Sequence, residues 1–206
     1  MKQEYGFYID VSRCTGCKTC QLACKDYKDL PADINFRRVY EFTGGGWQKT
    51  DDGWTNDVFA YYLSISCNHC SDPICVSICP TGAMYKQEDN GLVSVNEDVC
   101  IGCQSCEMAC PYGSPQYDER KGIMTKCNGC AERISLGLQP VCVESCPLRA
   151  LDFGPIDELR AKYGNQASIA PLPAATLTDP NLTITPGRTA RAPDDHSGLL
   201  GNPKEV

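Results

Sequence analysis

Long apolar runs and excess basic charge are both missing from this 206-residue chain. No stretch approaches about 18 consecutive apolar residues, and the N-terminus shows no signal-peptide apolar region, so we expect neither a transmembrane segment nor a signal peptide of its own. Lysine and arginine total 19 against 26 aspartate and glutamate, a net charge of -7. Without a basic stripe, nucleic acid is not expected as a partner.

Catalytic motifs are missing as well. The sequence contains no nucleophile elbow, P-loop, glycine-rich dinucleotide loop or paired-carboxylate motif. We therefore do not expect the chain to be an enzyme by itself.

Cysteine, in contrast, is abundant, with 16 residues arranged in four sets of four. Sets one and three have the spacing C-x2-C-x2-C-x3-C, which is typical of the bacterial ferredoxin loop that binds a 4Fe-4S cluster. Sets two and four lengthen one gap. Sixteen thiolates at four per cluster predict four 4Fe-4S clusters with iron as the metal. The sets are Cys14, Cys17, Cys20 and Cys24; Cys67, Cys70, Cys75 and Cys79; Cys100, Cys103, Cys106 and Cys110; and Cys127, Cys130, Cys142 and Cys146.

Two other uses of cysteine compete with clusters. A structural zinc-binding interaction module draws its ligands as two separated pairs, whereas these sets add a third cysteine after two residues. A disulfide framework suits shorter secreted chains, and such crowded cysteines would pair only with strain. Clusters are the preferred interpretation, with the zinc module as the remote alternative.

The chain also repeats itself. Residues 14–24 align with 100–110 at every cysteine, at the glycine and at the alanine, so sets one and three are copies of one half-module. Residues 79–84 resemble 146–151, which makes sets two and four copies of the other half. Gly16 and Gly102 occupy equivalent positions, where a loop that wraps a cluster needs backbone freedom.

A predicted hairpin suggests how the sets combine. Residues 83–95 are strand-like and interrupted by Asn90-Gly91, a hairpin signal that joins sets two and three into one two-cluster module. Sets one and four then form the second module, although pairing set one with two and three with four stays possible. In two-cluster ferredoxins the fourth cysteine ligates the other cluster. The expected ligand sets are Cys14, Cys17, Cys20 and Cys146 (cluster 1); Cys24, Cys127, Cys130 and Cys142 (cluster 2); Cys67, Cys70, Cys75 and Cys110 (cluster 3); and Cys79, Cys100, Cys103 and Cys106 (cluster 4).

The expected fold class is α+β, with two bacterial-ferredoxin-like modules of short strands, cluster-binding loops and short helices, related by the internal repeat. The outer module comprises residues 1–24 and 111–164, and the inner module residues 67–110. An insertion at 25–66 holds two strands, at 36–42 and 58–65, and a loop with Trp47 and Trp54, which serve either as partner anchors or as a lid over the adjacent module. A short helix is predicted at 155–164. The proline-rich tail at 165–206 is expected to be disordered or to lie on another subunit.

Charged and histidine side chains also lie near the cysteines in sequence. His69 lies between Cys67 and Cys70, but the cysteines already suffice as ligands, so we expect it near a cluster or in solvent. Arg13, Lys18, Lys25 and Arg149 flank cluster loops and could raise cluster potentials, although each one singly is better explained as solvated surface.

With these motifs in view, the sequence resembles the iron-sulfur electron-transfer subunits of anaerobic dimethyl sulfoxide reductases, among the four-cluster subunits of molybdopterin oxidoreductases. The likeness covers nearly the whole chain and is carried by Tyr5-Gly6-Phe7, by residues 13–20, by 59–70 and by 143–159. It agrees with the cluster pairing given above. Where nitrate-reductase-type subunits have tryptophan and a 3Fe-4S cluster, this chain has Cys103, which implies four 4Fe-4S clusters.

The resemblance also implies partners and a place of action. It implies a heterotrimer for anaerobic respiration, in which this chain passes electrons from an integral membrane anchor that oxidises menaquinol to a molybdopterin catalytic subunit that reduces dimethyl sulfoxide or related S- and N-oxides. A polysulfide, selenate or formate enzyme is the alternative partner. The chain would lie at the periplasmic face of the bacterial inner membrane, held through its partners after export with the catalytic subunit.

Overall fold

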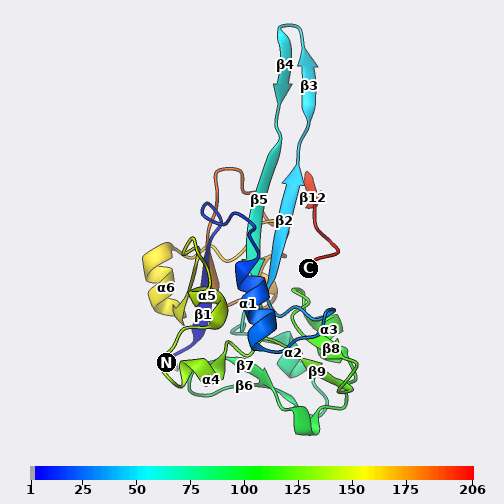
Figure 1. Cartoon of the computed structure of the whole chain (residues 1–206), viewed down its shortest axis with the longest axis vertical. Coiled ribbons are helices and arrows are strands. Elements are labelled where there is room, and N and C mark those ends of the chain that lie inside the picture. The colour runs from blue at the N-terminus through cyan, green and yellow to red at the C-terminus, as the bar shows by residue number, and fades with distance from the viewer. Residues whose placement is uncertain (1–2) are drawn as a thin grey trace.

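The computed structural model describes residues 3–206, so the first two residues of the predicted outer module lie outside the described residues. The elements are short and mixed in type (Figure 1). The helices are α1 (Thr19–Tyr27), α2 (Ile74–Ser77), α3 (Ser105–Ala109), α4 (Ala131–Ile134), α5 (Val141–Glu144) and α6 (Ile156–Tyr163), with the 3-10 turns η1 (Glu97–Val99) and η2 (Ala175–Leu177). The strands are β1 (Tyr5–Asp10), β2 (Arg38–Gly44), β3 (Trp47–Thr50), β4 (Gly53–Asn56), β5 (Phe59–Ile65), β6 (Met84–Lys86), β7 (Val93–Val95), β8 (Gln116–Asp118), β9 (Ile123–Thr125), β10 (Leu151–Pro155), β11 (Leu182–Thr185) and β12 (Gly198–Leu200).

A three-stranded sheet joins the two ends of the chain. β1 pairs antiparallel with β10 and parallel with β11, giving the order β10-β1-β11. Helix α6 covers β1, where the rings of Tyr8 and Tyr163 stack with centroids 3.6 Å apart. Pro155 precedes the first turn of α6 and Gly164, at φ 96°, ends it. The helix predicted at 155–164 is therefore confirmed.

The cysteine-bearing helices contact one another in two pairs. α1 contacts α5, and α2 contacts α3. The hairpin predicted between sets two and three is present as β6 and β7. A second hairpin, β8 with β9, packs beside it, since Met124 is buried with Met84 and Val93 in one apolar cluster. β8 and β9 belong to the range 111–164, which the sequence assigns to the outer module. They nevertheless pack on residues 67–110, because the chain after Cys110 turns back toward set three.

The insertion forms a long ribbon. The two predicted strands are present as β2 and β5, which pair over their whole length and continue into the hairpin β3-β4. This hairpin stands away from the rest of the molecule (Figure 1). Trp47 and Trp54 are 66% and 68% exposed, so the lid interpretation is wrong. Because Lys49 pairs with Trp54 and side chains alternate along a strand, both tryptophans lie on one face of the hairpin.

The tail lies on its own chain, which corrects the expectation that it is disordered or ordered on another subunit. β11 completes the first sheet, and β12 adds to β2 in the order β12-β2-β5. Asn202 donates from Nδ2 to the Val39 carbonyl at 2.9 Å. The tail has too few apolar residues for a core of its own, but short strands added to existing sheets do not need one.

Within residues 3–206, no helix is both long enough and apolar enough to cross a membrane.

Replacing Ile184 by alanine tests whether the tail stabilises the fold. Ile184 is 1% exposed in β11 and pairs with Ile9, so its truncation is expected to cost about 2–5 kcal/mol. The matched control is Leu199→Ala in β12, where the side chain is 66% exposed and the effect should stay within about 0.5 kcal/mol. Anaerobic thermal unfolding of the holoprotein measures both, and equal melting temperatures would contradict the assigned role of β11.

Candidate iron-sulfur sites

The structure gathers the sixteen cysteines into groups, and all of them are free thiols. The first group is Cys14, Cys17 and Cys20 from the loop before α1 and its first turn, with Cys146 from the segment after α5, and together they line one cavity of about 340 Å³. Gly16 allows this loop to turn tightly, since its φ is 71° and an added Cβ would lie 2.4 Å from the ring of Tyr62.

A second group of thiols lies in the inner part of the chain. Cys79, Cys100, Cys103 and Cys106 line a small cavity of about 10 Å³ that is completed by apolar side chains. Two backbone N–H groups approach its sulfurs, with Met84 N at 3.4 Å from Cys79 Sγ and Met124 N at 3.4 Å from Cys100 Sγ. In the cavity of the first group, Ala150 N lies 3.3 Å from Cys146 Sγ in the same way. Such hydrogen bonds stabilise thiolates.

The other eight cysteines are buried or half-buried. Burial raises the pKa of Cys24, and the nearby thiols of Cys127, Cys142 and Cys130 raise it further. Burial likewise raises the pKa values of Cys70 and Cys75 to about 12, with Cys67 and Cys110 adding to the effect in each case. Since such thiols resist ionisation alone, iron binding must release their protons.

Two thiols differ from the buried ones because they lie at the surface. Cys17 and Cys103 are exposed, and their pKa values are lowered, chiefly by hydrogen bonds from the Thr19 and Ser105 hydroxyls respectively. Cys17 belongs to the first cavity-lining group, and Cys103 belongs to the second. The groups that line cavities therefore reach the surface, whereas the other eight cysteines are buried or half-buried.

The described cysteines do not gather as the ligands of a single metal ion. Among residues 3–206, no three His, Cys, Asp or Glu side chains converge as ligands of one metal ion would. In a 4Fe-4S cluster each cysteine binds a different iron, so the sulfurs stand further apart than the four ligands of zinc.

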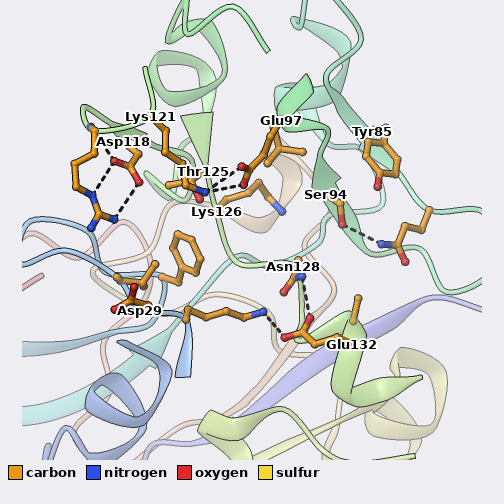
Figure 2. A pocket seen from close by; sticks show the side chains of 17 residues that line it. Asp29, Tyr85, Ser94, Glu97, Asp118, Lys121, Thr125, Lys126, Asn128 and Glu132 are labelled. Carbon is orange, nitrogen blue, oxygen red and sulfur yellow. Dashed lines mark hydrogen bonds and ion pairs between the residues drawn. The ribbon is translucent and has the colours of Figure 1, made fainter. Parts of the chain in front are cut away.

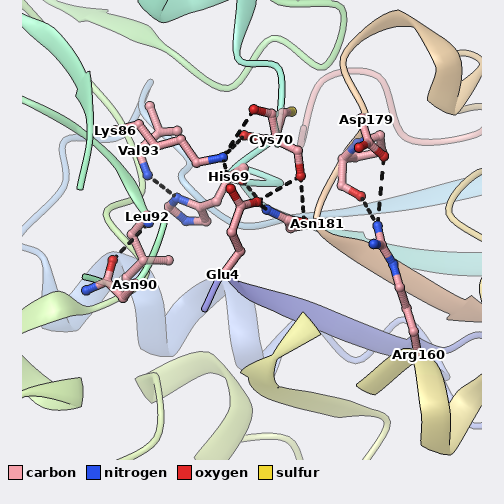
Figure 3. Close-up of polar contacts among 12 residues, drawn as sticks. Glu4, His69, Cys70, Lys86, Asn90, Leu92, Val93, Arg160, Asp179 and Asn181 are labelled. Carbon is pink, nitrogen blue, oxygen red and sulfur yellow. Dashed lines mark hydrogen bonds and ion pairs between the residues drawn. The ribbon is translucent and has the colours of Figure 1, made fainter. Parts of the chain in front are cut away.

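His69 lies near the cysteines and is fully buried, so the expectation that it might lie in solvent is wrong (Figure 3). Burial lowers its pKa well below the usual value, with Lys126 and Lys86 adding to the effect, so the ring is neutral. Its Nδ1 accepts a hydrogen bond from Val93 N at 2.9 Å. The ring proton therefore sits on Nε2, which faces Cys127 Sγ at 4.0 Å.

A polar network fixes the backbone of the same loop (Figure 3). Asn181 from the tail donates to the His69 carbonyl at 2.8 Å and to Glu4 at 2.6 Å. Lys86 donates to the Cys70 carbonyl at 3.0 Å and forms an ion pair with Glu4. The loop of set two is therefore held by residues from both ends of the chain.

The charged residues that flank the cysteines in sequence do not lie among the buried sulfurs. Arg13 pairs with Asp10, Lys18 with Glu205, Lys25 donates to the Ile34 carbonyl, and Arg149 donates to the Glu144 carbonyl. Sequence reasoning missed Arg37 and Lys126, which are 1% and 4% exposed. Lys126 could have been found from the sequence, because it directly precedes Cys127. Arg37 could not, because the serines that bind it are 27 and 29 residues away in sequence.

One surface groove does not have the features of a second site. It has a volume of about 790 Å³ and is lined largely by charged side chains (Figure 2). These charges are paired within the groove: Lys28 with Glu132, Lys121 with Glu97, and Arg120 with Asp118. Lys126 donates to the carbonyls of Val93 and Cys127. The groove therefore offers no unpaired cluster of charge to a ligand.

These sites and this fold define a class: the chain is a ferredoxin-type 4Fe-4S protein, and its sixteen cysteines suffice for four clusters. The 4Fe-4S dicluster domain family matches residues 58–156, and the 4Fe-4S binding domain family matches residues 11–28.

Curated relatives narrow the class. The B subunit of the anaerobic dimethyl sulfoxide reductase of Escherichia coli is 64% identical over all 206 residues and is covered completely. The polysulfide reductase B subunit of Wolinella succinogenes is 36% identical over 91% of this chain and 97% of its own, and the thiosulfate reductase electron transfer subunit of Salmonella typhi is 39% identical over 77% and 79%. The chain belongs to the family of anaerobic dimethyl sulfoxide reductase B subunits. Its role is electron transfer, and it is not the catalytic subunit of the complex.

Replacing His69 by leucine tests the role of its ring. The buried Val93 N–H would lose its acceptor, which is expected to cost about 1–3 kcal/mol of stability. The other histidine, His196, is exposed in the tail, and His196→Leu should change stability by less than about 0.5 kcal/mol. Anaerobic denaturant unfolding compares the two, and a His69 variant as stable as the His196 variant would contradict the assignment.

Proposed function

We propose that this chain relays single electrons through four 4Fe-4S clusters, from a membrane anchor that oxidises menaquinol to a molybdopterin catalytic subunit that reduces dimethyl sulfoxide or related S- and N-oxides. The observation that carries the proposal is the grouping of sixteen thiols into four sets, two of which reach the surface. Bound clusters supply reversible one-electron storage. The expected complex is a heterotrimer that serves anaerobic respiration.

The proposed ligand sets follow the grouping of the thiols. Cluster 1 takes Cys14, Cys17, Cys20 and Cys146; cluster 2 takes Cys24, Cys127, Cys130 and Cys142; cluster 3 takes Cys67, Cys70, Cys75 and Cys110; and cluster 4 takes Cys79, Cys100, Cys103 and Cys106. The lining of the two cavities supports clusters 1 and 4, and the mutual effects of the thiols on their pKa values support clusters 2 and 3. In each set one cysteine comes from a different part of the chain than the other three.

Clusters 1 and 4 would be the ends of the relay. Ile101 and Met108, close in sequence to Cys103, are 65% and 79% exposed, and Leu22, close to Cys17, is 65% exposed. Apolar side chains around an exposed thiol suit docking to another protein, because contact with a partner removes them and the cluster from water. The protein around clusters 2 and 3 would exclude water from the middle of the relay.

We further propose that the fold consists of two repeated ferredoxin-like modules. The pairing of β1 with β10 and of α1 with α5 supports an outer module from residues 1–24 and 111–164, except that β8 and β9 pack on the inner module. The contacts of β6, β7, α2 and α3 support an inner module at 67–110. Residues 25–66 are the insertion, and 165–206 the tail that braces both.

Dimethyl sulfoxide reductase is favoured over a polysulfide, selenate or formate enzyme as the complex. The support is the 64% identity to the dimethyl sulfoxide reductase subunit, against 36% to the polysulfide reductase subunit. We also propose that the protein is exported together with the catalytic subunit and lies at the periplasmic face of the inner membrane. Isolation of the tagged chain from anaerobically grown cells tests the partners: a copurifying molybdenum subunit with dimethyl sulfoxide reductase activity is expected, and activity toward polysulfide alone would overturn the assignment.

Metal analysis and a single substitution test the clusters. Anaerobically isolated protein is expected to contain about sixteen iron and sixteen sulfide, as four 4Fe-4S clusters require. Cys103→Ser should convert one cluster to a 3Fe form, which gives an electron paramagnetic resonance signal in the oxidised state.

The control for that variant is Ser105→Ala, which removes the hydroxyl 3.5 Å from Cys103 Sγ and keeps the thiol. It should retain all four clusters. Zinc in place of iron, or unchanged spectra in Cys103→Ser, would contradict the proposed ligands.

The β3-β4 hairpin is proposed as a subunit contact. Its exposed tryptophans share one face, and a two-stranded hairpin is marginally stable alone. The double variant Trp47→Ala with Trp54→Ala should reduce copurification of a partner subunit at least tenfold, because aromatic anchors dominate interfaces. Its cluster content should stay unchanged. The control is Gln48→Ala with Thr55→Ala on the opposite face, and equal recovery of partners by both variants would contradict the assignment.

A further inference from the structure

Arg37 is a buried cation held by serines. Its guanidinium donates from Nη1 to the carbonyl and to the hydroxyl of Ser64, both at 3.1 Å, and from Nη2 to the hydroxyl of Ser66 at 2.9 Å. The guanidinium carbon lies 4.7 Å from the centre of the Phe7 ring. Only 1% of Arg37 is exposed. These contacts fix the position of the charge, but none of them neutralises it.

No carboxylate lies against this charge. None of the ion pairs found among residues 3–206 includes Arg37, and its Nε has no hydrogen-bond partner in the described part of the chain. Burial of an unpaired guanidinium costs several kcal/mol. A compensating negative charge must therefore come from another kind of group nearby.

The negative groups near Arg37 are cysteine thiolates. Burial lowers its pKa, but the thiolates of Cys142, Cys20, Cys127 and Cys24 raise it by more than burial lowers it. In the proposed ligand sets, Cys20 belongs to cluster 1 and the other three belong to cluster 2. The guanidinium therefore lies near thiols of two proposed sites, each of which would carry about two negative charges when oxidised, thiolates included.

A serine hydroxyl connects Arg37 to cluster 1. Ser64 Oγ accepts from Nη1 of Arg37 and lies 3.3 Å from Cys20 Sγ. Because the oxygen of Ser64 accepts from the guanidinium, its own proton is free to be donated to the sulfur of Cys20. Hydrogen bonds to cluster sulfurs and nearby positive charge both favour the reduced state, which carries one more negative charge.

We propose that Arg37 is a positioning residue of the relay: a counter-cation shared by clusters 1 and 2 that raises the reduction potential of both. The proposal rests on the ligand sets given under Proposed function. Each cluster accepts one electron from its neighbour in the relay, and no proton or bond is exchanged with Arg37. Its fixed charge offsets part of the added negative charge at either cluster. The thiols that act most strongly on Arg37 include none from cluster 3 or cluster 4.

Redox titration of the intact complex, followed by electron paramagnetic resonance, tests the proposal. Arg37→Gln is expected to lower the ratio of reduced to oxidised form of clusters 1 and 2 about tenfold at a fixed potential, which is about 59 mV for one electron. Clusters 3 and 4 should keep their potentials. Arg37→Lys retains the charge and should shift clusters 1 and 2 less than Arg37→Gln does.

The matched control is Arg13→Gln. Arg13 lies beside Cys14 in sequence, but 63% of its side chain is exposed, so water screens its charge and its removal should leave all four potentials unchanged. If Arg37→Gln moves all four clusters equally, or none, the inference is overturned. A wild-type complex without four clusters would instead overturn the proposed function.

If the complex does not assemble with Arg37→Gln, the variant Ser64→Ala tests the proposal instead. Ser64→Ala removes only the hydroxyl between Arg37 and Cys20, since the Ser64 carbonyl and Ser66 still hold the guanidinium. The ratio of reduced to oxidised cluster 1 should fall about threefold, with cluster 2 unchanged. An unchanged potential of cluster 1 would contradict the shared role of Arg37.

Discussion

Burial of clustered thiolates is the constraint on which the rest of this structure depends. Thiols from distant parts of the chain must converge, lose their protons and carry negative charge where water does not reach. Burial alone opposes this, as the pKa of Cys142 shows by its rise to about 12 despite the nearby Arg37. Iron supplies most of the compensation, since metal binding is coupled to deprotonation and to folding. Short loops and short helices follow, because each loop must close around a cluster.

The buried cations answer the same constraint. Arg37 lies near the thiols of Cys20, Cys24, Cys127 and Cys142, and Lys126 lowers the pKa values of Cys67 and Cys75, opposing the effect of their burial. Arg38, 9% exposed, donates to the Tyr112 carbonyl near Cys110. None of these three forms an ion pair with a carboxylate among residues 3–206. The surface groups Arg13 and Lys18, in contrast, are neutralised by acidic side chains. Buried cations without a carboxylate partner among residues 3–206 therefore lie near cysteines of the interior.

The tail and the insertion have opposite places in the structure. The tail is an internal brace, because Asn181 fixes the loop of set two and β11 and β12 extend two sheets. The β3-β4 hairpin does the opposite and leaves its tryptophans in water. A peptide segment with few apolar residues can be well ordered when its backbone joins existing strands, whereas two strands without a third layer bury little on their own.

The sequence by itself determined the chemistry: the spacing of the cysteines, the glycines at 16 and 102 and the copied half-modules predicted 4Fe-4S clusters and the absence of a catalytic site. It also predicted the β6-β7 hairpin, β2, β5 and α6, because hydrophobic patterning and turn residues act locally. Only the tertiary structure decided where the tail lies, which way the tryptophans face and that Arg37 lies among the sulfurs. Those features arise from contacts between residues far apart in sequence, such as Arg37 with Ser64 or His69 with Val93, and local patterns carry no record of them.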